Sequence, residues 1–286
     1  MPDIPPTQTT LTTLEDPHRA GAPDGELEGR RGEVHRLAVE GRRAGIARRV
    51  GHVLCQGWLA VSRFEEVRRV SSSTLSLGHD AGAFYDLGWA LHATGDGAGA
   101  LESYGQALRL RRQVGDRAGE ATTLNNIGLA HRARGDLGQA LDHYGQALTL
   151  AQQVGNRAGE AATLNNIGGV HRARGDLGQA LDLFGQALPI LRQVGDRAGE
   201  AATLNNIGEV HRARGNLGQA LDHYGQALRL ARQVGDRAGE ATTLNNIGLV
   251  HWARGDLDQA LDHFGQALPL ARQVGGRAVE AVTMFN

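Results

Sequence analysis

Apolar residues recur at a helical spacing along most of the chain. In the segment 117–134 they fall three or four positions apart, at Ala121, Leu124, Ile127 and Ala130. This spacing places them on one face of an α-helix, and Gly135 follows as a helix stop. A second stripe then comprises Leu137, Ala140, Leu141, Tyr144, Ala147, Leu148 and Leu150. The pattern predicts two helices joined by a short turn.

Turn residues between the stripes support this prediction. Asp136 is expected to cap the second helix, with Gln139 completing a capping box. Gly155 is expected to end that helix, and Asn156, which corresponds to Asp116 one unit earlier, opens the next one.

The helix pair recurs with a fixed period. The tripeptide Asn-Asn-Ile starts at Asn125, Asn165, Asn205 and Asn245, and residues 121–160 and 161–200 differ at only 10 of 40 positions. We therefore expect five units of 40 residues over 81–280 and the start of a truncated sixth over 281–286. A single hairpin of this size cannot bury its apolar stripe, so the units must stack into a solenoid.

The first 80 residues differ from the repeats. Residues 1–30 are rich in Pro, Thr, Gly and charge, and we expect them to be disordered. Residues 31–80 are expected to hold a helix and a degenerate hairpin that turns at Ser62-Arg63. A basic cluster in this region is interpreted as a solvated helix face, or else as a face for an acidic partner or nucleic acid. It consists of Arg30, Arg31, Arg36, Arg42, Arg43, Arg48 and Arg49.

The repeated residues resemble a known family. Leu124, Ile127-Gly128, Ala140, Tyr144 and Ala147 have the spacing of the tetratricopeptide repeat (TPR) consensus. The chain departs from it in its 40-residue period, in His131 at a usual Tyr position and in the missing closing Pro. This form is similar to the arrays of Leu-Gly-Asn-repeat adaptors, kinesin light chain, bacterial signalling ATPases and proteins associated with CHAT proteases. The resemblance implies an all-α superhelical solenoid of antiparallel helix hairpins.

Composition narrows the function classes. The 30 basic residues, all Arg, nearly cancel the 31 acidic ones, which argues against nucleic acid as the partner. The single cysteine, Cys55, rules out an intramolecular disulfide framework. The N-terminus does not resemble a secretory signal, and apolar stretches are too short to span a bilayer. We expect a cytoplasmic protein without a membrane segment.

Catalytic and metal motifs are weak. Gly95-Asp96-Gly97 resembles part of a phosphate loop but lacks the full spacing and the preceding strand. Cys55 and His52 are one helical turn apart and could form a nucleophile pair, although a small core residue is the favoured reading of Cys55. We expect no enzyme and no cofactor.

Histidines form a second repeated set. His131, His171, His211 and His251 lie on successive hairpins, too far apart to share one metal ion, and are expected to be half-buried stand-ins for Tyr. A second set is expected at the surface: His143, His223 and His263.

The resemblance also implies a binding groove. In TPR folds the first helix of each hairpin lines a concave groove, where asparagines commonly hydrogen-bond the backbone of a bound peptide. Carried over, these positions are Asn126, Asn166, Asn206 and Asn246. A row six residues further on, suited to carboxylates, is Arg132, Arg172, Arg212 and Trp252. A position that varies between repeats, as selective recognition requires, is Leu129, Gly169, Glu209 and Leu249.

Each of these sets has a simpler reading. The amides can bind water, the arginines can serve the helix C-termini, and the variation can be drift. The favoured function is a protein-protein interaction scaffold that binds an extended, acidic peptide or partner protein in the groove. The alternative is a regulatory or sensor fragment of a larger bacterial signalling protein, suggested by the stop within a helix at Asn286. An apolar face around Leu257, Leu261 and Phe264 would then lack a neighbour and allow end-to-end self-association.

Overall fold

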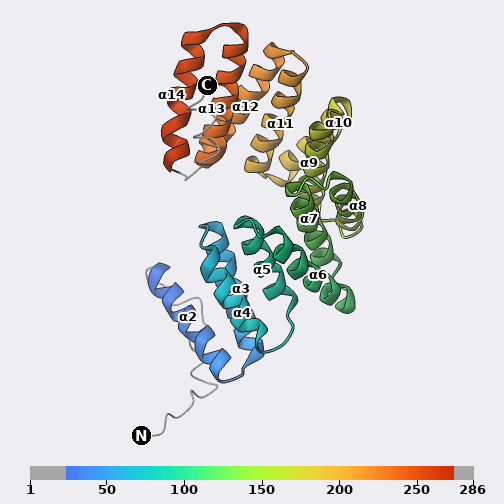
Figure 1. Ribbon diagram of the computed structural model, residues 1–286, viewed down its shortest axis with the longest axis vertical. Coiled ribbons are helices and arrows are strands. Elements are labelled where there is room, and N and C mark those ends of the chain that lie inside the picture. Colours follow the sequence, from blue (N-terminus) through green and yellow to red (C-terminus); the bar gives the residue numbers. More distant parts are fainter. Residues whose placement is uncertain (1–23, 274–286) are drawn as a thin grey trace. The chain divides into compact units, whose positions relative to one another are not determined.

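The computed structural model describes residues 24–273, which form 13 α-helices and no strand (Figure 1). The chain divides into two compact units, residues 1–150 and 151–286, which are described separately. The expectation of an all-α solenoid is confirmed. The expected start of a sixth unit, residues 281–286, lies outside the described residues.

Unit 1 contains seven helices, the last of which ends just past the boundary. They are α2 (Asp24–Glu40), α3 (Ala44–Ala60), α4 (Phe64–Leu75), α5 (Ala81–Ala93), α6 (Gly97–Val114), α7 (Arg117–Ala133) and α8 (Leu137–Gln153). Unit 2 contains α9 (Arg157–Arg174), α10 (Leu177–Val194), α11 (Arg197–Ala213), α12 (Leu217–Val234), α13 (Arg237–Arg254) and α14 (Leu257–Gln273).

The N-terminal helices differ in detail from the expectation. Helix α2 starts at Asp24, so residues 24–30 are helical rather than part of a disordered segment. The chain then turns at 41–43, where Arg42 has a positive φ of 52°. This turn divides the basic cluster between α2 and α3, so the prediction of one basic helix face is wrong. Helices α3 and α4 form the expected hairpin, with its turn at 61–63.

Each repeated hairpin closes over a glycine. A Cβ added to Gly168 would lie 2.6 Å from the ring of Phe184, which is fully buried on the partner helix. The same contact, at 2.5–2.7 Å, recurs in the other four hairpins. The facing pairs are Gly88–Tyr104, Gly128–Tyr144, Gly208–Tyr224 and Gly248–Phe264. Glycine therefore allows the two helices of a hairpin to approach closely.

Side-chain capping follows the sequence at the start of the first helices, but not at the start of every second helix. The side chain of Asn156 accepts a bond from the Gly159 N–H at 2.9 Å, and the three equivalent Asp residues do the same. Helix α10 starts differently, because Asp176 makes no side-chain cap bond. Its carboxylate lies 3.3 Å from Nδ1 of His171 instead. The capping box predicted for the second helices is therefore wrong at this position.

Curvature within each unit follows from which helices touch. In unit 2 the first helices contact one another directly, α9 with α11 and α11 with α13, whereas the second helices α10, α12 and α14 do not. In unit 1, α5 contacts α7 in the same way. Helices that are closer together lie on the inside of a curve. The first helices therefore line the inner face of each unit.

A ladder of buried carboxylates joins successive hairpins and was not predicted. Glu200 is 4% exposed, and its two oxygens accept bonds from Arg192 at 2.7 Å and Arg197 at 3.0 Å. Arg192 ends the preceding hairpin and Arg197 lies on the same helix as Glu200. Glu120 and Glu240 have the same pair of partners, while Glu160 accepts from Gln152 in place of an arginine. Each carboxylate therefore ties one hairpin to the next.

The last described hairpin leaves apolar residues uncovered. Leu257 is 57% and Leu261 is 65% exposed, as the repeat pattern predicts. Phe264 is only 5% exposed because it packs on Gly248 within its own hairpin, so its inclusion in the uncovered face is wrong. No helix among residues 24–273 is both long and apolar enough to cross a membrane.

Candidate functional site

The second asparagines Asn126, Asn206 and Asn246 lie on first helices and each bonds the neighbouring repeat. In unit 2, Nδ2 of Asn206 donates to Oδ1 of Asn165 at 3.2 Å, and Nδ2 of Asn246 donates to Oδ1 of Asn205 at 3.1 Å. In unit 1, Asn126 donates to the hydroxyl of Tyr85, which stands at the Asn125 position one repeat earlier. One function of these amides is thus to hold adjacent first helices together.

The second asparagines of the four repeats differ in solvent exposure. Asn126, Asn166 and Asn206 are half-buried, while Asn246 is 7% exposed and also lies 3.4 Å from Oε1 of Glu209. Asn206 uses its nitrogen for Asn165, which leaves its oxygen as the acceptor available to a ligand. An acceptor at this position suits a peptide N–H group.

The arginine row does not form a uniform basic strip. Nη1 of Arg172 lies 2.6 Å from Oε2 of Glu209, so a salt bridge connects α9 to α11 and neutralises the middle of the row. Arg132 and Arg212 lie instead beside the buried hydroxyls of Tyr144 and Tyr224. Burial raises the pKa of both phenols to about 12, and the neighbouring guanidinium groups oppose that rise.

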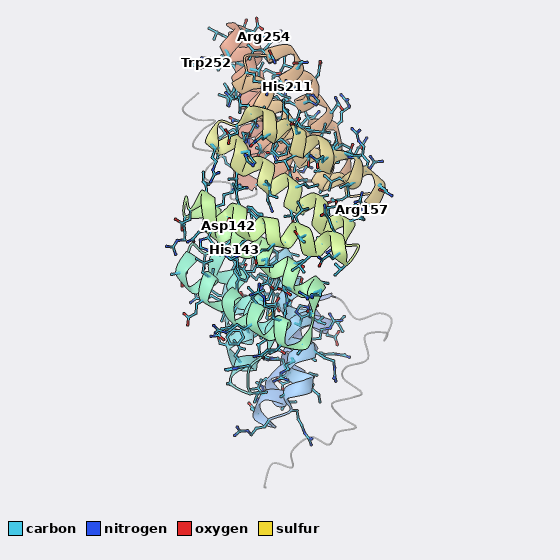
Figure 2. All side chains as sticks on the ribbon, turned by 90° about the vertical axis from the view of Figure 1, so that its right-hand side faces the viewer. Asp142, His143, Arg157, His211, Trp252 and Arg254 are labelled. Carbon is cyan, nitrogen blue, oxygen red and sulfur yellow. The ribbon has the colours of Figure 1, made fainter. Side chains whose placement is uncertain are left out.

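Sequence differences between the hairpins are consistent with the different partners of Arg172 and of the other two arginines. The residue equivalent to Tyr144 and Tyr224 in the Arg172 hairpin is Phe184, which has no hydroxyl. The next repeat supplies the one acid of the variable position, Glu209. At that position Leu129, Gly169 and Leu249 are half-buried. The last member of the row, Trp252, is 58% exposed (Figure 2). The site residues therefore differ in charge and size from one repeat to the next.

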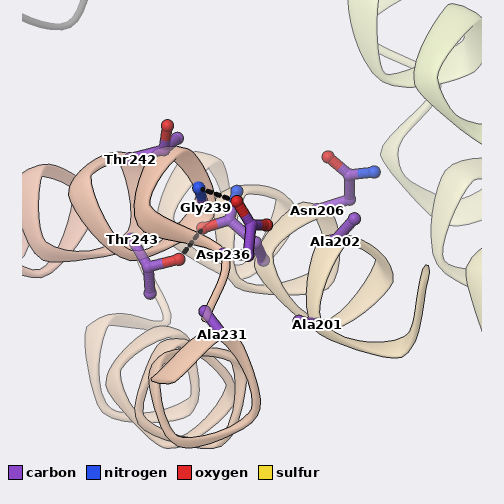
Figure 3. Close-up of a pocket in the computed structure, with 9 residues that line it drawn as sticks. Ala201, Ala202, Asn206, Ala231, Asp236, Gly239, Thr242 and Thr243 are labelled. Carbon is purple, nitrogen blue, oxygen red and sulfur yellow. Dashed lines mark hydrogen bonds between the residues drawn. The ribbon is translucent and has the colours of Figure 1, made fainter. Parts of the chain in front are cut away.

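A small hollow opens beside Asn206 in unit 2 (Figure 3). Its volume is about 160 Å³, close to the ~150 Å³ of a cavity that holds one benzene ring. Alanine and glycine form much of its wall, and polar groups supply the rest. The lining residues are Ala201, Ala202, Asn205, Asn206, Ala231, Asp236, Gly239, Thr242 and Thr243. The side chain of Asp236 is occupied by the N–H of Gly239, and Thr243 donates to Asn205.

This hollow was missed from sequence, although a signal for it exists. Residues 202 and 162 are Ala, whereas the corresponding residues 122 and 242 are Thr. A smaller side chain on α11 leaves room between α11 and α13. The hollow is of a size to take one apolar side chain of a ligand, with the Asn206 amide at its edge.

The candidate nucleophile pair does not form. Cys55 is 1% exposed, burial raises the pKa of its thiol to about 12, and its sulfur lies 3.5 Å from Oγ of Ser71. His52 bonds the buried carboxylate of Asp86 at 2.9 Å instead. A buried thiol with a raised pKa is a poor nucleophile. The glycine-rich turn is likewise filled, because Asp96 accepts the N–H of Gly99.

Sequence comparison assigns the repeats to one family. The tetratricopeptide repeat profile matches residues 119–193 and 199–273, and a second tetratricopeptide repeat profile matches 83–118. No curated protein matches the sequence.

Solved structures share the fold at low identity. BtubC from P. vanneervenii is 19% identical with a TM-score of 0.59, over 78% of this chain and 92% of that one. A signal transduction ATPase with a tetratricopeptide repeat sensor, from Pyrococcus horikoshii, is 12% identical with a TM-score of 0.72, over 96% of this chain and 41% of that one. Rap complexed with Competence and Sporulation Factor is 13% identical with a TM-score of 0.69, over 90% of this chain and 79% of that one.

Proposed function

The chain belongs to the tetratricopeptide repeat family, and on this premise we propose that it is a protein-interaction scaffold that holds an extended peptide segment of a partner on the inner face of unit 2. The hollow beside Asn206 is the observation that carries the proposal. It combines space for one side chain with an amide oxygen that a peptide N–H can approach. Rap, a structural neighbour, is complexed with Competence and Sporulation Factor, which accords with binding by such a fold.

Charge narrows the chemistry of the ligand. The Arg172–Glu209 salt bridge is neutral as a pair, so it favours neither sign of charge at the centre of the face. Arg212, one repeat further along, is exposed and lies on the same helix as Asn206. A ligand carboxylate is best placed there, because the guanidinium group forms forked bonds with carboxylates. The proposed ligand has one apolar side chain followed by an acidic residue.

Removing the acceptor beside the hollow is expected to weaken binding. A displayed library of extended peptides is selected on the full chain, and the selected peptide is measured against variants by calorimetry. We expect Asn206→Ala to raise the Kd of the selected peptide about 5- to 10-fold, because the variant loses one hydrogen bond to the peptide and changes the shape of the hollow. Arg212→Ala is expected to raise the Kd of acidic peptides and to leave that of neutral ones unchanged.

Controls separate binding from folding. Asn206→Ala also removes the bond to Asn165, so the helix content and unfolding midpoint of each variant are measured with its Kd. Gln186→Ala changes an exposed amide on the second helix α10 and is expected to leave Kd unchanged. Equal Kd values for wild type and Asn206→Ala, both fully folded, would show that the peptide binds elsewhere.

The alternative function is a sensor or restraint within a larger signalling protein. The likeness to the repeat sensor of the archaeal ATPase motivates it, but at 12% identity that likeness supports the fold alone. Sequencing the genomic reading frame around Asn286 tests this hypothesis. Continuation into an ATPase or protease domain would favour it over a free-standing scaffold.

A further inference from the structure

Three hairpins contain a pair of stacked imidazole rings. His211 on α11 and His223 on α12 lie with their ring centroids 5.2 Å apart and their planes 4° from parallel. His251 and His263 stack in the same way in the next hairpin, at 5.4 Å and 15°. In unit 1, His131 stacks on His143 at 5.3 Å and 5°. The second histidine of each pair is half-buried and not at the surface, which corrects the sequence prediction for His143, His223 and His263.

The pairs are short of hydrogen bonds. Nδ1 of His211 and Nδ1 of His223 are both buried without a partner within the described residues, and so is Nδ1 of His263. Stacking therefore holds these rings by packing and not by fixed polar contacts. An imidazole in this position has little to stabilise a positive charge, and its stacked neighbour would also repel it.

Unit 2 also contains a hairpin without the pair. In α9 and α10, His171 faces the position of Leu183, which replaces the second histidine. Because residues 161–200 otherwise copy the neighbouring repeats closely, this hairpin is a built-in control. It has the same fold and the first histidine, but it lacks the stack.

Charged groups around the pairs are few. His211 has Arg214 of its own helix nearby, and His223 has Asp222 beside it. His263 is influenced by Asp262 and by Arg232 of α12, while His251 lies 3.5 Å from the carboxylate of Asp256. In unit 1 the corresponding groups are Asp136, Asp142 (Figure 2) and Arg112 of α6.

We propose that the stacked pairs make the last two hairpins of unit 2 sensitive to mild acid, so that α11–α14 open more readily as the pH falls from neutral, while α9–α10 lacks this response. The device is independent of the ligand. It would couple the stability of the inner face to pH in the range where histidine titrates.

The direction follows from the titration of the rings. Burial lowers the pKa of His223 and of His263 below 6.5, and the stacked partner lowers each further. Burial also lowers the pKa of His211. The unfolded chain therefore takes up protons at a higher pH than the folded chain. Stability is complete above the unfolded pKa and falls as the pH drops through 6.5 towards the folded pKa values.

The test replaces the stack with the pair found in the control hairpin. Amide exchange of the full chain is followed by mass spectrometry at pH 7.5 and pH 5.5 and corrected for the intrinsic exchange rate. We expect protection in α11–α14 of the wild type to fall several-fold more at pH 5.5 than protection in α9–α10. In the double variant His223→Leu, His263→Leu, this difference between α11–α14 and α9–α10 is expected to shrink to less than half of its wild-type size.

The reverse substitution keeps the proposal falsifiable if the double variant fails to fold. Leu183→His builds the missing stack, and α9–α10 is then expected to acquire the same acid sensitivity. Ring proton chemical shifts are followed through the same pH range to confirm that the second histidines titrate below 6.5. An equal loss of protection in wild type and double variant, or a folded Leu183→His protein with an unchanged α9–α10, would overturn the proposal.

Discussion

Gly168→Ala is expected to destabilise unit 2 by about 2 kcal/mol. The added Cβ would lie 2.6 Å from Cε1 of Phe184, closer than carbon atoms approach without displacement. The ring is fully buried, so it has no free space to move into. Overpacking of this kind costs up to about 3 kcal/mol, from which about 1 kcal/mol is recovered because alanine favours a helix more than glycine does. A fall in the urea midpoint, followed by circular dichroism, measures the loss.

The same hairpin supplies a control of opposite sign. Gly185 lies on the partner helix α10, is exposed, and a Cβ built there meets nothing within 4 Å. Gly185→Ala should therefore gain about 0.5–1 kcal/mol from helix propensity alone. If Gly168→Ala left the midpoint unchanged while Gly185→Ala raised it, the two helices would have to be free to separate, and the close hairpin described here would be incorrect.

These two glycines illustrate what the sequence could predict about the fold. The period, the helix boundaries and the close-packing role of Gly128 and Gly168 all depend on residues near one another in sequence. Copies of a hairpin repeat the same local signals, so each copy strengthens the prediction. Gly145 lies inside α8, and no neighbour lies within 4 Å of its added Cβ.

The family resemblance named candidate positions for the site, and the contacts of these residues were not predictable from sequence. The bond from Asn206 to Asn165 depends on the distance between two first helices. Arg172 was expected to remain available for a carboxylate, and its pairing with Glu209 depends on the register of α9 against α11. Register across the solenoid is a tertiary property that a repeat pattern does not contain.

Two repeated features were missed although the sequence carries a trace of each. The stacked histidines are 12 residues apart, as in His211 and His223, a spacing that spans one hairpin turn. The equivalents of Glu200 recur at every fortieth residue, each preceded by an arginine three residues away, but a carboxylate at a helix start is usually interpreted as a helix-dipole partner. Its burial depends on the preceding hairpin, which covers it.

Glu200→Ala is expected to cost about 2–3 kcal/mol, the second large effect. The substitution removes two charge-assisted hydrogen bonds from a carboxylate that is only 4% exposed, and the bond from Arg192 joins two hairpins. Arg192 and Arg197 are half exposed or more, so water can solvate them once the carboxylate is gone, which keeps the cost below that of a stranded buried charge. The unfolding midpoint in urea at pH 7 measures the loss.

Arg192→Gln is the matched variant, because Gln152 already occupies this position beside Glu160 and bonds it at 3.2 Å. It keeps a donor for the carboxylate and is expected to cost less than about 1 kcal/mol, as for an exposed ion pair. A loss as large as that of Glu200→Ala would mean that the arginine charge, not the buried bond, carries the interaction.

The pH dependence of the Glu200→Ala effect tests the same interaction, because protonation of the Glu200 carboxylate removes its charge. Burial alone would raise the pKa of Glu200, but the bonds from Arg192 and Arg197 outweigh it and hold the pKa below 4.5. The stabilisation is therefore present above pH 4.5 and is lost as the pH falls through the folded value. Wild type and Glu200→Ala should differ at pH 7 and pH 5.5 alike and converge only below 4.5. Convergence at pH 5.5 would contradict a carboxylate held by two arginines.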